Sequence, residues 1–129
     1  MAKQSNSRHL FVVDDEFTIV STLAMILKYQ GFRVSSFTDP SKALQALQTT
    51  APDLLLTDVV MPTFSGIELG IKFLEIHPGC SVILFSGQPV TSQLLDVARA
   101  EGHVFEVLAK PIHPTDLLTK IRSVFEIEL

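Results

Sequence analysis

The chain has 129 residues, a length that fits one domain with a single sizeable hydrophobic core. Almost half of the residues are hydrophobic, but no apolar segment approaches the roughly eighteen residues of a membrane span. The formal net charge is −4 and no cluster of Lys and Arg exists, which argues against direct nucleic-acid binding. Residues 1–8 are polar and lack the apolar core of a secretion signal. We therefore expect a disordered tail over residues 1–8, a domain over residues 9–129 and a cytoplasmic location.

The first half of the chain predicts two strands and two helices. Residues 10–13 are an apolar run without alternation, typical of a strand covered on both faces, and three acids follow it. Helical spacing of apolar residues predicts a helix over residues 17–30, ended by Gly31. Residues 32–37 alternate between apolar and polar, the pattern of an edge strand. A second helix is predicted to begin at Pro40 or Ser41 and to be broken by Pro52.

The centre of the chain holds another apolar run, residues 54–56, that leads directly into Thr57 and Asp58. This pattern predicts a covered strand with Asp58 at its exposed tip, and Pro62 then begins a loop. A helix is predicted over residues 67–76, and we expect it to bury Leu69, Phe73, Leu74 and Ile76.

The last third predicts two further strands and two further helices. Residues 81–85 form an apolar strand that ends at Ser86 and Gly87, and Cys80 beside it is expected to be a buried, inert thiol. A helix over residues 91–101 is predicted to begin at a cap on Thr91 or Ser92 and to end at Gly102. A strand over residues 104–108 then leads to Lys110 and Pro111, and residues 113–115 open a helix that runs almost to Leu129.

Five strands that alternate with five helices predict an α/β fold: a doubly wound parallel sheet with helices on both faces. The carboxyl ends of parallel strands lie along one edge of the sheet, which is where ligands bind in such folds. The side chains that follow the first, third, fourth and fifth strands should therefore converge there, and they are Asp14, Asp15, Asp58, Ser86 and Lys110.

Three carboxylates brought close together repel one another unless some stay protonated or a cation neutralises them. Oxygen ligands without a Cys or His set favour a hard cation, and Mg²⁺ is the usual intracellular candidate. The four histidines show no metal-ligand spacing and are expected in surface or turn positions: His9, His77, His103 and His113. A metal ion, an ammonium and a hydroxyl around one carboxylate make a receptor for a phosphoryl group carried by that carboxylate.

These residues resemble the response-regulator receiver domains of two-component signalling, over about residues 10–125. The resemblance rests on Val13-Asp14-Asp15, on Asp58-Val59-Val60-Met61-Pro62 with Gly66, on Ser86-Gly87 and on Lys110-Pro111. It implies the flavodoxin-like and CheY-like strand order 2-1-3-4-5. It also implies that Asp58 takes a phosphoryl group from a histidine kinase or histidine phosphotransfer protein, so that the chain is a phosphoacceptor and not an enzyme.

The resemblance further assigns the surrounding residues. Mg²⁺ would be held by Asp14, Asp15, Asp58 and the backbone carbonyl of Val60. The phosphoryl group would be bound by Ser86, Gly87 and Lys110, with a cis bond before Pro111. Spontaneous dephosphorylation would be tuned at Val60 and Gln88. The fourth helix, the fifth strand and the last helix would form the docking face for a downstream protein, with a polar rim from Thr91, Gln93, Lys120 and Arg122.

The sequence departs from the family three residues before the lysine, where Val107 replaces the usual Tyr or Phe of the switch. Phe105 shares that face of the strand but lies one repeat away. We therefore expect a small conformational change, or one read through Ser86, Gly87 and the following loop.

Several other interpretations remain open. Asp58 and Ser86 could serve only in turns, Asp14 and Asp15 could only favour a helix amino terminus, and Lys110 could be a solvated lysine. A phosphohydrolase of the haloacid-dehalogenase type lacks a general acid here, since Glu16 and Val60 occupy the two candidate positions. A flavin or dinucleotide site lacks a phosphate loop after Val13. The stronger alternative is a pseudo-receiver that acts only as a phosphorylation-independent interaction module.

Overall fold

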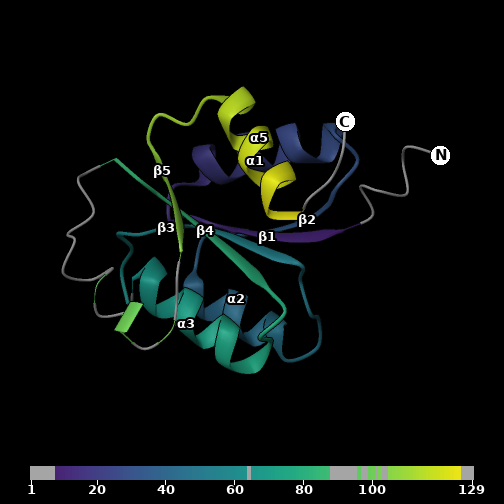
Figure 1. The fold of residues 1–129 in the computed structure, drawn as a ribbon. Helices are drawn as coiled ribbons and strands as arrows, with labels where there is room; N and C mark the ends of the chain where they lie inside the picture. The colour runs from purple at the N-terminus through teal and green to yellow at the C-terminus, as the bar shows by residue number, and fades with distance from the viewer. Residues whose placement is uncertain are drawn as a thin grey trace.

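The computed structural model describes residues 8–63, 65–87, 96, 99–100, 102 and 105–125. Five strands form one parallel sheet in the order β2-β1-β3-β4-β5, and they are β1 (His9–Val13), β2 (Arg33–Phe37), β3 (Leu54–Asp58), β4 (Ser81–Ser86) and β5 (Glu106–Ala109). Figure 1 shows α1 (Phe17–Tyr29) and α5 (Pro114–Phe125) on one face, and α2 (Pro40–Leu47) and α3 (Gly66–Ile76) on the other. The predicted doubly wound fold and its strand order are confirmed.

Some predicted features lie outside the described residues. They are residues 1–7 of the expected tail, most of the helix expected over residues 91–101 with Thr91, Ser92 and Gln93, and the positions Gln88, His103 and Val104.

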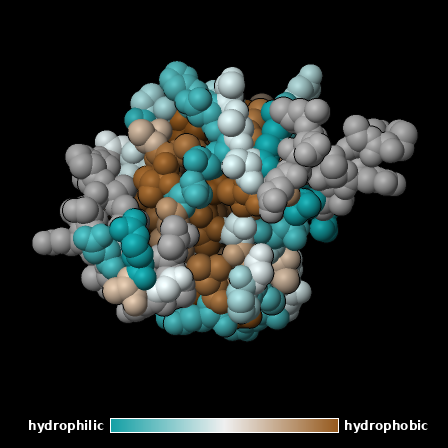
Figure 2. All heavy atoms as spheres, in the orientation of Figure 1, coloured by the Kyte–Doolittle hydropathy of each residue, from teal (hydrophilic) through white to brown (hydrophobic). Residues whose placement is uncertain are grey.

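Two hydrophobic layers hold the helices on the sheet. The central strands have no exposed residue on either face, which explains their unalternating sequence. Phe11, Leu55 and Leu84 face the layer under α2 and α3, whereas Leu10, Leu54 and Ile83 face the layer under α1 and α5. In Figure 2, hydrophobic residues gather in the middle of the visible face, between the more hydrophilic helical layers.

Side chains cap the starts of α2 and α3. The Asp39 carboxylate accepts a hydrogen bond from the Ser41 amide at 2.9 Å, and Ser65 and Glu68 form a reciprocal capping box before α3. Helix α1 differs, because its first flanking residue, Glu16, makes no side-chain capping hydrogen bond.

The predicted buried face of α3 needs one correction. Leu69 and Phe73 are buried as expected, but Ile76 is 51% exposed because it is the last residue of the helix, where the chain turns toward β4. Leu74 is only partly buried. Two glycines complete the inner face, since Gly66 and Gly70 let the helix approach the sheet closely. Apolar periodicity does not count glycine, and the sequence pattern therefore missed them.

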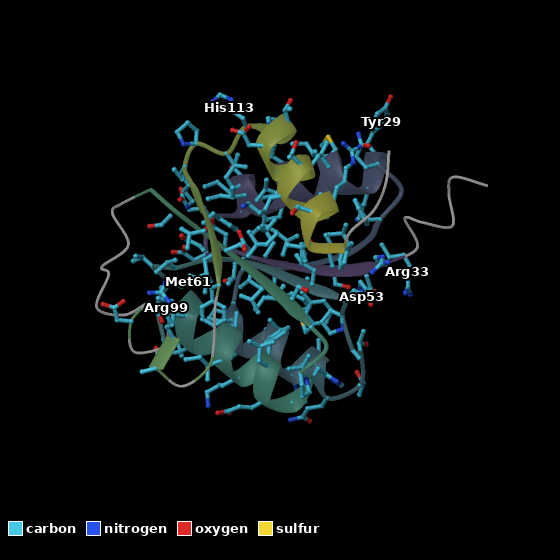
Figure 3. All side chains as sticks on the ribbon, in the orientation of Figure 1. Tyr29, Arg33, Asp53, Met61, Arg99 and His113 are labelled. Carbon is cyan, nitrogen blue, oxygen red and sulfur yellow. The ribbon has the colours of Figure 1, made fainter. Side chains whose placement is uncertain are left out.

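The two ends of the sheet carry different chemistry. Figure 3 shows Asp53 and Met61 at opposite ends of β3. At the amino end, Asp53 accepts a hydrogen bond from the His9 amide at 2.8 Å, and Cys80 is buried nearby. Burial raises the pKa of the Cys80 thiol to about 12, in agreement with the inert thiol predicted from the sequence. Within the described residues, no helix combines the length and apolar character needed to cross a membrane.

Candidate functional site

Asp14 and Asp58 end two neighbouring strands and are both buried. Asp14 follows β1, is fully inaccessible to solvent, and accepts a hydrogen bond from the Glu16 amide at 2.9 Å. Asp58 is the last residue of β3 and is 6% exposed. The expectation that Asp58 occupies an exposed tip is therefore wrong.

The following turn explains why Asp58 is covered. The Val59 amide donates to the Phe85 carbonyl of β4 at 3.0 Å, so the backbone stays paired beyond the strand. The Gly66 amide then donates to the Val59 carbonyl at 2.8 Å, which folds the start of α3 back over the strand end. Thr63 in this turn takes a positive φ of 78°, an uncommon conformation for a residue other than glycine.

Three carboxylates meet as the topology predicted. One oxygen from each of Asp14, Asp15 and Asp58 lies within 4.8 Å of the other two, and Asp15 is the exposed member. The alternative in which the first two acids only favour a helix amino terminus does not account for this convergence with β3. A set of three carboxylates suits a hard divalent cation.

Lys110 supplies a positive charge to this cluster from the end of β5. Its ammonium donates to the Asp14 carboxylate at 3.1 Å, lies 3.4 Å from the Asp58 carboxylate and 4.0 Å from that of Glu16. Its side chain is only 18% exposed, so the solvated-lysine alternative is wrong. The Lys110-Pro111 bond is cis, as the resemblance implied.

Burial governs the electrostatics of these groups. It raises the pKa of Asp14 to about 6 and also raises the pKa of Asp58, although Lys110 opposes both changes. Burial alone would lower the pKa of Lys110, but the hydrogen bond to Asp14 and the charges of both aspartates produce a net increase. The site therefore holds negative charge that one lysine only partly compensates.

An open pocket of about 280 Å³ gives access to this cluster. It is lined by Glu16, Asp58, Val60, Ser86, Gly87 and Lys110. Ser86 ends β4 and is buried, and its carbonyl accepts a hydrogen bond from the Lys110 amide at 2.9 Å. An added Cβ at Gly87 would meet the Lys110 side chain at 3.6 Å, an ordinary contact, so space alone does not require glycine there.

Two residues of the site gain a role that spacing did not predict. A Cβ added at Gly66 would overlap the carbonyl oxygen of Asp58, so glycine is needed for the turn that covers Asp58. Glu16 reaches the same pocket as Asp58 and Lys110. Its position in the acidic run of residues 14–16 was the available signal.

A second, more apolar pocket of about 410 Å³ lies beside the first. It is lined by residues of α1 and of the segment after β5, which are Thr18, Ile19, Thr22, Leu23, Lys110, Pro111 and Ile112. Lys110 lines both pockets, which makes them neighbours.

The position of the usual aromatic switch is exposed. Val107 is 37% exposed on the edge strand β5. Phe105 instead packs against the core under α2 and α3, where an added Cβ at Gly70 would lie 3.3 Å from its ring.

Comparisons with known proteins agree with this geometry. The family model described as "Response regulator receiver domain" matches residues 10–122. A probable transcriptional regulatory protein, TcrX of Mycobacterium tuberculosis, is 26% identical over 114 residues, which cover 88% of this chain and 48% of TcrX. The DNA-binding response regulator MtrA of Mycolicibacterium smegmatis is 27% identical over 116 residues, 90% of this chain and 50% of MtrA. The chain thus spans about half the length of these curated relatives.

Solved structures give the same fold. The receiver domain of an HD domain-containing protein from Pseudomonas fluorescens has a TM-score of 0.85 at 26% identity, with 93% of this chain and 95% of that chain covered. A CheY-like receiver domain protein from Methanospirillum hungatei has a TM-score of 0.84 at 25% identity, with 93% and 94% covered.

Proposed function

The chain belongs to the response regulator receiver domains, and from this premise we propose that Asp58 accepts a phosphoryl group from a phosphohistidine on a partner protein. The observation that carries the proposal is the buried Asp58 carboxylate within 3.4 Å of the Lys110 ammonium, in a cluster with Asp14 and Asp15. On this proposal the chain is a phosphoacceptor that assists its own phosphorylation and slow dephosphorylation, and not an enzyme that acts on other molecules.

The transfer exchanges one bond to phosphorus for another. An Asp58 oxygen forms the new P–O bond, and the P–N bond of the donor breaks with its electron pair kept by the donor nitrogen, which takes up a proton. Lys110 lies between Asp58 and Asp14, and it would bind one outer phosphoryl oxygen. Ser86 and Gly87 line the same pocket and would contact the other outer oxygens through a hydroxyl and a backbone amide.

The residues present fit a magnesium ion. Asp14, Asp15 and Asp58 offer three hard oxygen ligands in one place, and we add the Val60 carbonyl as a fourth. When bound, Mg²⁺ supplies positive charge that neutralises the carboxylates and the phosphoryl oxygens.

We infer that a donor protein docks where the two pockets meet. A phosphohistidine must enter the pocket that contains Asp58, and the apolar pocket on α1 is the adjoining surface on which a partner can bury hydrophobic side chains. A histidine kinase or a histidine phosphotransfer protein meets both requirements.

Output would pass through protein contacts. A phosphoryl group adds nearly two negative charges to the site. These charges shift the equilibrium between two conformations of the domain, to the extent that one conformation makes better contacts with the phosphoryl group than the other. The docking face would include β5 and α5, where Lys120 already pairs with Glu106 at 2.8 Å. DNA binding is named for MtrA, a protein about twice as long, and no nucleic-acid contact is proposed for the part described here. Tuning of dephosphorylation at Val60 and Gln88, and the cytoplasmic location, stay predictions.

The proposal is tested by incubating the chain with Mg²⁺ and either phosphoramidate or acetyl phosphate and measuring its intact mass. We expect an increase of one phosphoryl group that chelation of the metal prevents and Asp58→Asn abolishes. Asp39→Asn, the same exchange at an exposed helix cap, should label normally. A wild-type chain that neither donor labels would refute the proposal and favour the phosphorylation-independent docking module.

A further inference from the structure

Glu16 occupies the N-cap position of α1, but its side chain makes no capping hydrogen bond. It flanks the start of α1, and its backbone carbonyl accepts hydrogen bonds from Ile19 and Val20. Its carboxylate makes no capping bond, whereas Asp39 and Ser65 do cap the helices that they precede. Glutamate is not among the preferred residues at this position, so helix formation does not explain it.

The Glu16 carboxylate instead belongs to the rim of the acidic pocket. It lies 4.0 Å from the Lys110 ammonium, and its side chain is 64% exposed. Asp58 and Lys110 are far less exposed, at 8% and 18% of their side chains, and form the inner part of the pocket. The Glu16 backbone is also fixed, because its amide donates to the buried Asp14 carboxylate at 2.9 Å.

The geometry of phosphoryl transfer makes this rim important. The attacking and leaving atoms lie roughly in line on opposite sides of phosphorus. Since Asp58 attacks from inside the pocket, the leaving group departs through the mouth, past Glu16 and Val60. A negative charge there favours a donor whose leaving part carries a positive charge before cleavage, and it opposes a donor whose leaving group gains a negative charge.

This inference rests on the proposed function. We propose that Glu16 is a specificity-determining residue that selects phosphoramidate-type donors, in which the leaving nitrogen is protonated, over acyl phosphates. With a P–N donor, the nitrogen or its ring carries a positive charge before cleavage, the electron pair of the breaking bond returns to that nitrogen, and the leaving group departs as a neutral amine or imidazole. With an acyl phosphate, the electron pair of the breaking P–O bond leaves on a carboxylate. Glu16 attracts the positive charge that the first donor still partly carries in the transition state, and it repels the negative charge that develops on the second.

The test compares two small donors on the same protein. Rates of Asp58 phosphorylation are measured by intact mass in saturating Mg²⁺ with phosphoramidate, whose nitrogen is protonated near neutral pH, and with acetyl phosphate. We expect Glu16→Gln to raise the ratio of the acetyl phosphate rate to the phosphoramidate rate by about threefold to tenfold, the range for one charge at a partly solvated site. Glu16→Lys should raise it further, and Glu75→Gln, on an exposed position of α3, should leave it unchanged.

Salt separates this charge effect from a structural one. The change in ratio should shrink as ionic strength rises, because the Glu16 side chain is exposed to solvent. Equal changes for both donors in Glu16→Gln, or a ratio independent of salt, would overturn the inference and leave the proposed function intact. A wild-type chain that neither donor labels would overturn both. Circular dichroism and Mg²⁺ titration calorimetry establish that each variant is folded and binds metal.

Discussion

Replacing Asp14 by Asn should stabilise the metal-free protein, and the gain should depend on pH. Asp14 is fully buried, and its pKa in the folded chain is about 6, against 3.8 for the ordinary group. The native state therefore holds this proton over a pH range in which the unfolded chain has released it. For a pKa that folding raises, the free energy of unfolding falls as pH rises through this range.

The size of the effect follows from those two values. Complete ionisation of a group whose pKa rises from 3.8 to about 6 costs on the order of 3 kcal/mol, and about 2 kcal/mol of this appears between pH 4.5 and 7.5. Asparagine does not ionise. The difference in unfolding free energy between Asp14→Asn and the wild type should therefore grow by about 2 kcal/mol over that interval.

Urea unfolding followed by circular dichroism measures this directly, with a chelator present and without relying on tryptophan, which the chain lacks. Other titrating groups largely cancel in the comparison of the two proteins. The exposed Asp39→Asn exchange serves as the surface control in the same assay. A constant difference for Asp14→Asn, or a wild type that gains relative stability toward pH 7.5, would refute the reasoning.

Three further measurements probe other parts of the site and sheet. Lys110→Met leaves two buried carboxylates without their cation, so it should lower the free energy of unfolding by about 2–4 kcal/mol at pH 7.5 and by less at pH 5. A loss of stability in urea unfolding that does not depend on pH would contradict this. Gly66→Ala should lower the free energy of unfolding by about 2–4 kcal/mol in the same assay, because its Cβ would overlap the Asp58 carbonyl. A Cβ at Gly79 would meet nothing within 4 Å, so Gly79→Ala should change stability little. Equal effects of the two substitutions would be inconsistent with the tight turn. Burial and the charge of Arg33 lower the pKa of His9, so its titration midpoint in NMR spectra should lie below 6.5. Its contribution to stability should therefore be lost as pH falls through that region. A midpoint above 6.5 would reverse the sign of this pH dependence.

The sequence predicted the fold well where one physical rule dominates. The apolar runs before Asp14 and before Asp58 lack alternation because both faces of β1 and β3 are covered, and the parallel topology then brings both acids to one edge. Lys110 was predicted for the same reason, as the residue that follows the last strand. These inferences needed only local patterns and the shared direction of the strands.

The sequence predicted less where backbone contacts between distant segments determine whether a residue is buried. The covering of Asp58 depends on the pairing of Val59 with Phe85 and on the close approach of Gly66, and neither follows from residue spacing. Ile76 has the right period to be buried, but it lies at the end of α3 and is half exposed. The reach of Glu16 to Lys110 also requires knowledge of how α1 begins relative to β5.

The central claim, that a single buried carboxylate accepts the phosphoryl group, is tested most directly by identifying the modified residue. After reaction with phosphoramidate, and separately with acetyl phosphate, in the presence of Mg²⁺, borohydride reduces an aspartyl phosphate to homoserine, and peptide mass spectrometry then locates it. We predict homoserine at position 58 alone. Homoserine at position 14 or 15, or at no position in a folded and metal-loaded sample, would contradict the account.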